Sequence, residues 1–236
     1  MNIGIIAATD FEYEELIHSL KESNIDTVSL VDSCYTTAHL SIINDNAVYT
    51  ICSGAGKVNA AIATAWLVQQ CKCKTVICVG VCSTTCYLSG DILIPSSVIE
   101  GDCDTTAIGE PMWLMQKLNC VVLPTSKPLV EQFEDAAMRL NYTFRAGLMY
   151  TSDEFVTTPM NNKMFLHRCN AADLQEFPTS IDMEAAAVGH AAQVLGAQFA
   201  IIKSVSDRGD SKDYAQLKES AAALAVYILI EALRRF

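Results

Sequence analysis

Short apolar runs and longer amphipathic segments alternate along the chain. Runs rich in apolar and β-branched residues are typical of buried strands, and the segments between them carry apolar residues at helical spacing. This alternation favours a mostly parallel sheet with helices on both faces. The expected strands lie at residues 2–8, 47–53, 75–80, 90–95, 145–151 and 197–207, and the expected helices at 14–22, 59–70, 129–140, 183–195 and 217–235.

The length and composition are those of one folded unit. The chain has 236 residues, of which 51% are hydrophobic and 18% charged, so it can bury a large core. No internal repeat, low-complexity tract or linker divides it. We therefore expect a single α/β domain over residues 1–236, with a mixed, mostly parallel central sheet flanked by helices. Residues 100–121 are polar, and we expect them to form a long excursion that borders a site.

Charge and apolar run length exclude several classes of partner. The formal net charge is −11 and the basic residues are scattered, which argues against nucleic-acid binding. The longest apolar run, residues 221–230, is far shorter than the roughly 20 residues that span a bilayer. The first residues lack the cationic region of a signal peptide. We expect a soluble cytoplasmic protein without nucleic-acid or membrane partners.

The ten cysteines indicate free thiols rather than a metal site. They show no pair of CxxC motifs, and the four histidines at 18, 39, 167 and 190 show no ligand spacing. We expect small buried residues in a reducing compartment, with no metal and no cofactor. The cluster CVGVCSTTC at 78–86 is the stretch that we would watch for oxidation.

Three acidic residues lie close to expected strand ends, where ligands bind in sheets of this kind. Glu12 follows the first strand and Asp207 ends the last, while Glu184 precedes a run of small residues in DMEAAAVGHAA. Glu12 could simply favour the positive end of a helix, and Asp207 could be a helix cap or turn residue. Glu184 has no such simple reading, because small residues indicate close helix packing and burial of the acid. The stretch SGAGKVNAA lacks the spacing of a phosphate loop, so its glycines indicate a tight turn near a ligand.

Five motifs in this order resemble one family over the whole chain. They are MNIGIIAATDFEYE, SGAGKVNAA, TSDEFV, IDMEAAAV and KSVSD. Together they resemble the 5′-methylthioadenosine/S-adenosylhomocysteine nucleosidases, within the nucleoside phosphorylase superfamily. The resemblance implies a homodimer that hydrolyses the N-glycosidic bond of a small-molecule purine nucleoside and releases adenine.

The resemblance also implies roles for the three acids. Asp207 matches the general acid that protonates the purine at N7, which needs a raised pKa. Glu12 matches the carboxylate that orients and deprotonates the attacking water. Glu184 matches the residue that accepts hydrogen bonds from the ribose hydroxyls, and its charge would stabilise a cationic sugar.

Further substrate-binding residues follow from the same resemblance. Met183 would lie along the sugar, Phe155 would stack on the purine, and the backbone of Val156 would bind its edge. Gly80 and Ser206 are expected in the same substrate site. For Asp182, beside these residues, we expect a solvated or capping acid and no role in the reaction.

The chain also departs from the family pattern. Val81 and Cys82 stand where the family has smaller or polar residues, and Lys203 replaces the usual Arg. Thr9 and Ala55 stand where the family tends to place larger apolar groups around the 5′ substituent. These changes bear on water geometry and 5′ specificity. Two alternatives stay open: a phosphorylase of the same superfamily, and a non-catalytic relative that binds nucleosides.

Overall fold

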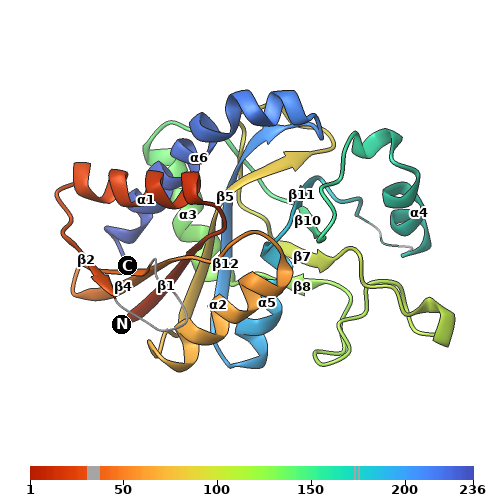
Figure 1. Ribbon diagram of the computed structural model, residues 1–236, viewed down its shortest axis with the longest axis horizontal. Coiled ribbons are helices and arrows are strands. Elements are labelled where there is room, and N and C mark those ends of the chain that lie inside the picture. The colour runs from red at the N-terminus through yellow and green to blue at the C-terminus, as the bar shows by residue number, and fades with distance from the viewer. Residues whose placement is uncertain (31–37, 173, 175) are drawn as a thin grey trace.

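The computed structural model describes residues 1–30, 38–172, 174 and 176–236. In this part of the chain twelve strands join one mixed sheet in the order β2-β3-β4-β1-β5-β11-β10-β7-β8, with β12 beside β5 and β6, and β9 beside β6 (Figure 1). The strands are β1 Asn2–Ala7, β2 Thr27–Leu30, β3 Ala38–Ile43, β4 Asn46–Cys52, β5 Thr75–Thr84, β6 Ile92–Leu93, β7 Ser97–Glu100, β8 Leu123–Pro124, β9 Phe144–Arg145, β10 Leu148–Thr151, β11 Ser180–Asp182 and β12 Gln198–Asp207.

The centre of the sheet is parallel. β1 pairs in parallel with β4 on one side and β5 on the other, and β12 also pairs in parallel with β5. The carboxyl ends of these four strands therefore meet at one edge. The short strand β11 runs antiparallel to the end of β5, pairing Ile181 with Ser83, so its following residues reach the same edge.

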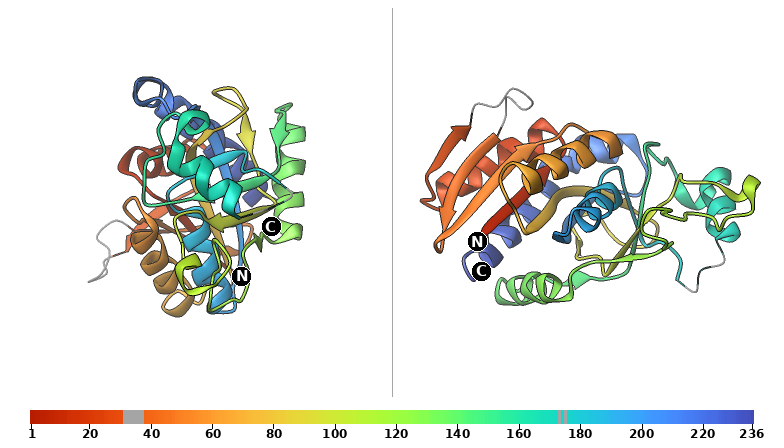
Figure 2. Two further views of the ribbon diagram at one scale, coloured as in Figure 1. Left: turned by 90° about the vertical axis from the view of Figure 1, so that its right-hand side faces the viewer. Right: turned by 90° about the horizontal axis from the view of Figure 1, so that it is seen from below.

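Helices cover both faces of the sheet. On one face α1, α3 and α6 share a hydrophobic core with β1, and on the other α2 and α5 pack against each other and the sheet (Figures 1 and 2). The helices are α1 Asp10–Glu22, α2 Lys57–Gln69, α3 Lys127–Arg139, α4 Lys163–Ala171, α5 Ala185–Val194 and α6 Ser211–Leu233.

Small residues let α5 approach the sheet closely. A Cβ at Gly189 would lie 2.6 Å from the ring of Phe199 on β12, so a larger residue would push the helix away. The alanines around Gly189 are buried as well. The expectation that the small residues after Glu184 allow close helix packing is therefore confirmed.

A second group of elements lies at one end of the molecule. Figures 1 and 2 show α4 beside the excursion of residues 100–121. Buried aromatic side chains hold this end together: Trp113 packs edge-on against Tyr150 at a centroid distance of 5.7 Å, and Tyr150 packs against Phe165 at 5.0 Å. The excursion is therefore anchored to the sheet rather than extended into solvent.

The predicted fold class is confirmed, and each predicted strand and helix has a counterpart. The hydrophobic pattern missed β2, β3, β7, β8, β11 and α4, most of which are short and depend on their neighbours in the sheet. None of the nine described cysteines takes part in a disulfide, and Cys34 lies outside the described residues. Within the described residues, no helix is both long and apolar enough to cross a membrane.

Candidate active site

A cavity opens at the carboxyl ends of the central strands. It is lined by residues at or just after the ends of β1, β4, β5, β10, β11 and β12, and by Tyr214 of the last helix. Ligands of α/β sheets bind at this edge. The lining residues are Ala8, Thr9, Glu12, Ala55, Val81, Cys82, Ser83, Glu154, Phe155, Val156, Ile181, Asp182, Met183, Glu184, Ser206, Asp207 and Tyr214.

Glu12 both caps a helix and lines the cavity. It is the third residue of α1, and its Oε2 accepts hydrogen bonds from the backbone N–H groups of Ala8 and Thr9 at 3.1 and 2.9 Å. The Thr9 hydroxyl donates to the same oxygen at 2.8 Å. The N–H of Val81 donates to Oε1 at 2.8 Å, which ties α1 to the end of β5. Glu12 therefore lies in the first turn of a helix, as the simpler alternative expected, and it also lines the cavity, as the site prediction expected.

Gly80 makes room for that carboxylate. Its φ is +151°, and a Cβ built on it would overlap the carboxyl group of Glu12. Any side chain at this position would displace Glu12. Gly80 does not itself line the cavity, although its neighbour Val81 does.

Glu184 lies at the start of α5 and is buried, with 5% of its surface exposed. Its Oε1 accepts a hydrogen bond from the Gly56 N–H at 3.0 Å. The Nζ of Lys203, which is fully buried on β12, lies 3.6 Å from Glu184 Oε2 and 3.4 Å from Asp182 Oδ2. One ammonium group therefore sits between two carboxyl groups.

The crowding of charge around Lys203 shifts the pKa values of both partners. Burial raises the pKa of Glu184 from 4.5 to about 7, and Lys203 offsets only part of this rise while Asp182 and Glu12 add to it. Burial alone would lower the pKa of Lys203, but the surrounding acids more than compensate and raise it well above its usual value. The ammonium stays charged near neutrality, whereas Glu184 exchanges a proton there.

Asp207 ends β12 at a register shift opposite Ser83. Such irregularities turn a side chain toward a site. Its Oδ2 accepts a hydrogen bond from the Ser206 hydroxyl at 2.7 Å, and its Oδ1 accepts one from the Gly209 N–H at 2.7 Å. Burial nevertheless raises the pKa of Asp207. A carboxyl group of this kind can hold a proton for transfer.

The remaining wall of the cavity is apolar. Val156 is buried, Met183 is half-buried, and the Phe155 ring is 42% exposed at the rim. Tyr214 packs edge-on against Phe155 with ring centroids 5.6 Å apart. This wall offers flat and apolar surface to a ring-shaped ligand.

The cavity brings together almost all of the residues expected in the site. Glu12, Phe155, Val156, Met183, Glu184, Ser206 and Asp207 all line it. Tyr214 was missed because the sequence pattern placed the start of the last helix at residue 217. The signal was present: Asp210 caps α6, since its Oδ1 accepts from the N–H groups of Lys212 and Asp213.

The expectation for Asp182 is half right. Asp182 caps α5, because its Oδ2 accepts from the Ala185 N–H at 2.9 Å. It is not solvated: only 6% of the residue is exposed, and its Oδ1 accepts from the Thr151 hydroxyl at 2.6 Å. A buried acid there needs the cation that Lys203 supplies.

The polar excursion borders a different hollow from the one expected. Glu100 and Lys117 line an open hollow of about 930 Å³ between α2 and α5, together with Lys57 and His190. None of the excursion's residues, all of which the structure describes, lines the cavity at the strand ends.

The strand ends of this α/β sheet hold four buried acids, one buried lysine and an aromatic wall, and such a set of polar and apolar groups suits a small-molecule site. The sequence model described as the phosphorylase superfamily matches residues 2–234, and the chain belongs to that superfamily.

Individual relatives are more specific. A 5′-methylthioadenosine/S-adenosylhomocysteine nucleosidase of a Shewanella species (strain W3-18-1) is 30% identical and is covered over 100% of its length by 99% of this chain. The solved nucleosidase of that name from Neisseria meningitidis, in complex with methylthio-immucillin-A, is 25% identical with a TM-score of 0.84, covering 100% of this chain and 99% of the other. The futalosine hydrolase of Helicobacter pylori shares the fold, with a TM-score of 0.89 at 18% identity over 100% of this chain and 98% of the other.

Proposed function

We propose that the protein is a nucleosidase that hydrolyses the N-glycosidic bond of 5′-methylthioadenosine, S-adenosylhomocysteine or both, releasing adenine and the thioribose. The observation that carries the proposal is the convergence of Glu12, Glu184 and Asp207 on one cavity beside an aromatic wall. Relatives matched over almost their whole length bear this enzyme name, which supports it.

On the base side, Asp207 is the proposed general acid. Adenine leaves more readily when it is protonated, and burial raises the pKa of Asp207, which favours the protonated form that a general acid needs. Phe155 would stack on the purine, and the backbone of Val156 would bind its edge. Ser206 would hold the acid in position through its 2.7 Å hydrogen bond.

On the sugar side, Glu12 and Glu184 divide the work. Cleavage passes through a sugar with oxocarbenium character, so negative charge near the ring lowers the barrier. Glu184 would accept hydrogen bonds from the ribose hydroxyls, with Met183 along the sugar. Glu12 would orient and deprotonate the attacking water. Gly80 contributes by leaving space for the Glu12 carboxylate.

The cavity favours water over phosphate as the nucleophile. Phosphate sites are commonly built from arginines, because the guanidinium fork matches phosphate oxygens. None of the six arginines, all of which the structure describes, lines the cavity, and Arg208 is exposed. Lys57 points its ammonium group at Asp102 instead. Glu12 would also repel an incoming dianion.

The test separates hydrolysis, phosphorolysis and binding alone. The purified chain is incubated with 5′-methylthioadenosine, S-adenosylhomocysteine, adenosine, inosine and futalosine, in phosphate-free buffer and again with millimolar phosphate. We expect adenine and a free thioribose without phosphate. A ribose 1-phosphate formed only with phosphate would establish a phosphorylase, and binding without cleavage would establish a non-catalytic relative.

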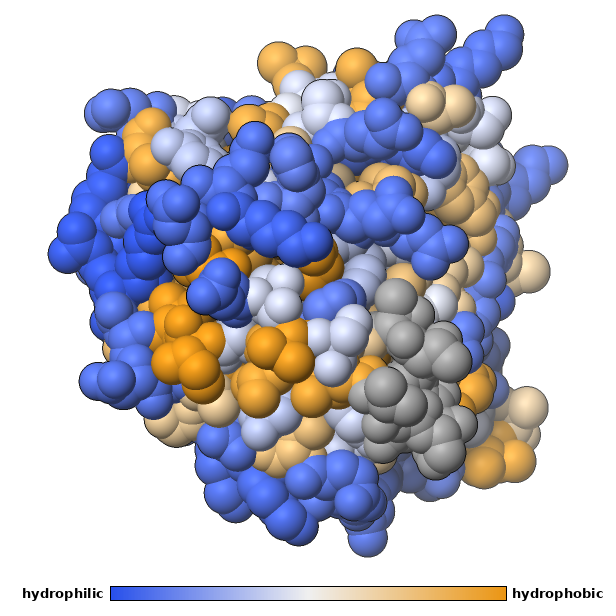
Figure 3. All heavy atoms as spheres, turned by 60° about the vertical axis from the view of Figure 1, so that its left-hand side comes forward, coloured by the Kyte–Doolittle hydropathy of each residue, from blue (hydrophilic) through white to orange (hydrophobic). Residues whose placement is uncertain are grey.

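We further propose a homodimer formed through α2 and α5. Figure 3 shows, on the face that it presents, that exposed apolar side chains can gather among hydrophilic ones on this molecule. The apolar side chains that carry the proposal are those on α2 and α5. Val58 and Ile62 of α2 and Val194 of α5 are exposed by 68%, 53% and 44%, which is a high exposure for neighbouring apolar side chains. A second copy would cover them.

Sedimentation equilibrium tests the dimer. Ile62→Glu should give a monomer, because a charge would enter the interface. The matched control is Ile42→Glu on β3, which is 61% exposed on another element and should leave the dimer intact. Equal masses for Ile62→Glu and the wild type would contradict this interface. We also propose a cytoplasmic location, because no disulfide joins any of the nine described cysteines. Fractionation of cells that express the chain tests this location.

A further inference from the structure

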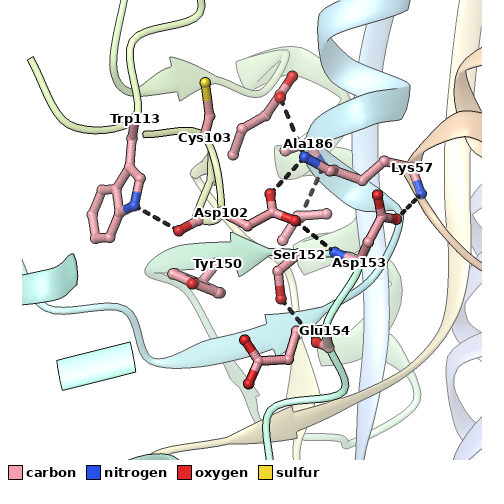
Figure 4. Close-up of polar contacts among 12 residues, drawn as sticks. Lys57, Asp102, Cys103, Trp113, Tyr150, Ser152, Asp153, Glu154 and Ala186 are labelled. Atoms are coloured by element: carbon pink, nitrogen blue, oxygen red, sulfur yellow. Dashed lines mark hydrogen bonds and ion pairs between the residues drawn. The ribbon is translucent and has the colours of Figure 1, made fainter. Parts of the chain in front are cut away.

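Two loop segments border the cavity, and a hydrogen bond joins them. The first contains Gly56 and begins α2 at Lys57, while the second contains Asp153 and follows β10. The backbone N–H of Lys57 donates to Asp153 Oδ1 at 2.7 Å. Figure 4 shows the Asp153 carboxyl group pointing toward the Lys57 backbone nitrogen.

Asp102 closes this contact into a ring. Its Oδ2 accepts a hydrogen bond from the backbone N–H of Asp153 at 2.9 Å, and its Oδ1 accepts one from Lys57 Nζ at 2.5 Å (Figure 4). The ring thus runs from the Lys57 backbone to Asp153, on to Asp102, and back to the Lys57 side chain. Three segments far apart in sequence are fastened by three bonds.

The position of Asp102 is fixed by the residue before it. Gly101 donates its N–H to the Thr151 carbonyl at 2.8 Å and accepts the indole N–H of Trp113 at 2.7 Å. A Cβ at Gly101 would overlap the ring of Tyr150, so the backbone lies directly on that ring. Asp102 therefore extends from a rigid base rather than from a loose loop.

Lys57 also lies near Glu100, which is paired in turn with His190, so the charges around the ring have partners. Glu100 Oε2 lies 3.6 Å from Lys57 Nζ, and Glu100 Oε1 lies 2.6 Å from His190 Nδ1. The side chains of Lys57 and Asp102 are each 19% exposed, so water screens them in part. Burial lowers the pKa of Lys57, but its bond to Asp102 and the nearby acids raise it overall.

Both fastened segments carry groups that face the cavity. The residue before Lys57, Gly56, donates its N–H to Glu184 Oε1 at 3.0 Å. The residues directly after Asp153 line the cavity as Glu154, Phe155 and Val156. A shift of either segment would move a hydrogen bond to Glu184 or the surface proposed to bind the base.

We propose that Asp102 is a positioning residue for the reaction: through Lys57 and Asp153 it sets the distance between the segment that bonds Glu184 and the segment that binds adenine. The inference rests on the proposed function. Asp102 itself does not line the cavity, so its effect passes through these two partners.

The test compares Asp102→Ala with Asp104→Ala. Asp104 belongs to the same excursion, but its Oδ1 accepts only from the N–H and hydroxyl groups of Thr106 among the hydrogen bonds of the described residues. For Asp102→Ala we expect KM and the Kd for adenine to rise about tenfold or more, because small displacements in a site are costly. Asp104→Ala should match the wild type.

A pH profile supplies a readout that a merely structural role would not move. If Gly56 moves away, Glu184 loses a hydrogen bond to its charged form, so the acid limb of kcat/KM should shift to higher pH. Lys203, Asp182 and Glu12 also face Glu184, and they are unchanged in the variant. Asp102→Asn keeps one acceptor oxygen, so its KM, its Kd for adenine and its acid limb should lie between those of Asp102→Ala and the wild type.

A double-variant cycle then asks whether Lys57 and Asp102 act together. The double variant Lys57→Met/Asp102→Ala should have the same KM and the same Kd for adenine as Asp102→Ala alone, because both substitutions break the same ring. Additive losses, or KM, adenine Kd and acid limb all unchanged in Asp102→Ala, would overturn the inference. If Asp102→Ala does not fold, Asp102→Asn and Lys57→Met carry the same test. Adenine binding needs no turnover, so it still tests Asp102 if the wild-type chain cleaves none of the nucleosides.

Discussion

The molecule holds two clusters in which a lysine meets several acids, and they behave differently. Lys203 is fully buried with Asp182 and Glu184, and its Nζ lies 3.4 and 3.6 Å from their oxygens. Lys57 is partly exposed and makes a 2.5 Å hydrogen bond with Asp102. The two clusters contain the same types of residue, and they differ in their exposure to water and in their hydrogen-bond partners.

The pKa values of one acid in each cluster express this difference. The pKa of Glu100 is lowered, first by its hydrogen bond with His190 and then by Lys57, against the effect of burial. The pKa of Glu184 is raised by burial to about 7. The cluster beside Lys57 thus has satisfied charges and suits a structural role, whereas the cluster around Lys203 keeps an acid that can change its charge near neutrality.

The largest expected effect is that of Asp207→Asn. An amide cannot protonate the departing adenine, and general acid catalysis is typically worth about 10² to 10⁴ in rate. We expect kcat to fall by such a factor while a substrate analogue still binds. Asp210→Asn is the control, because Asn caps a helix as well as Asp. Turnover of Asp207→Asn within threefold of the wild type would remove Asp207 from the mechanism.

Glu12→Gln should reduce both rate and stability. The amide cannot deprotonate water, which we expect to cost about 10² in kcat. The glutamine NH₂ group cannot accept hydrogen bonds, so either the bonds from Ala8 and Thr9 or the bond from Val81 is lost. Losing such bonds lowers the free energy of unfolding by about 1–3 kcal/mol. Urea unfolding and steady-state rates measure the two effects. Full hydrolysis from pH 5 to 8 would contradict the role of Glu12.

The two lysines can be compared directly. Lys203→Met leaves Asp182 and Glu184 buried without a cation, which should lower the free energy of unfolding by about 3–5 kcal/mol. Lys57→Met leaves Asp102 with its Asp153 N–H donor and Glu100 with His190, so neither acid loses all its partners, and we expect a loss of about 0–1 kcal/mol. Chemical unfolding at pH 8 measures both. Equal losses would show that burial does not distinguish the clusters.

The last prediction is a pH dependence of stability, which is spread over a range of pH rather than concentrated at one condition. The pKa of Glu184 rises from 4.5 to about 7 on folding, so between these values the folded chain binds more protons there than the unfolded chain. Its contribution to the free energy of unfolding is complete below the lower value and is lost as the pH rises through the upper one. Glu184→Gln should flatten the unfolding free energy across this window. An unchanged slope in this variant would assign the titration to another group.

The sequence predicted the central strands and most of the cavity because their signals are local. The central strands β1, β4, β5 and β12 are buried along most of their length. Each is followed, or ended, by an acidic residue or a glycine-containing turn that the sequence shows directly. β11 is three residues long and exists because β5 and β10 flank it, so no local pattern marks it. The Lys57 ring joins residues 57, 102 and 153, which only the folded sheet brings together.

The cysteine cluster at 78–86 shows the same limit. Burial raises the pKa of Cys78 to about 12 and that of Cys82 well above its usual value, although Cys82 lines the cavity. Cys86, four residues further on, is exposed. Sequence spacing grouped the three thiols, but burial makes two of them unreactive as nucleophiles near neutrality.

The fit between Gly80 and Glu12 has a consequence for how this sequence can change over generations. Because a Cβ at position 80 would occupy the space of the Glu12 carboxylate, the two positions cannot vary independently. A descendant that lost the acid would be free to gain a side chain at 80, and such a residue would then block the acid's return. In an aligned set of related sequences, a residue other than glycine at position 80 should therefore mark a lineage that has given up the carboxylate at position 12.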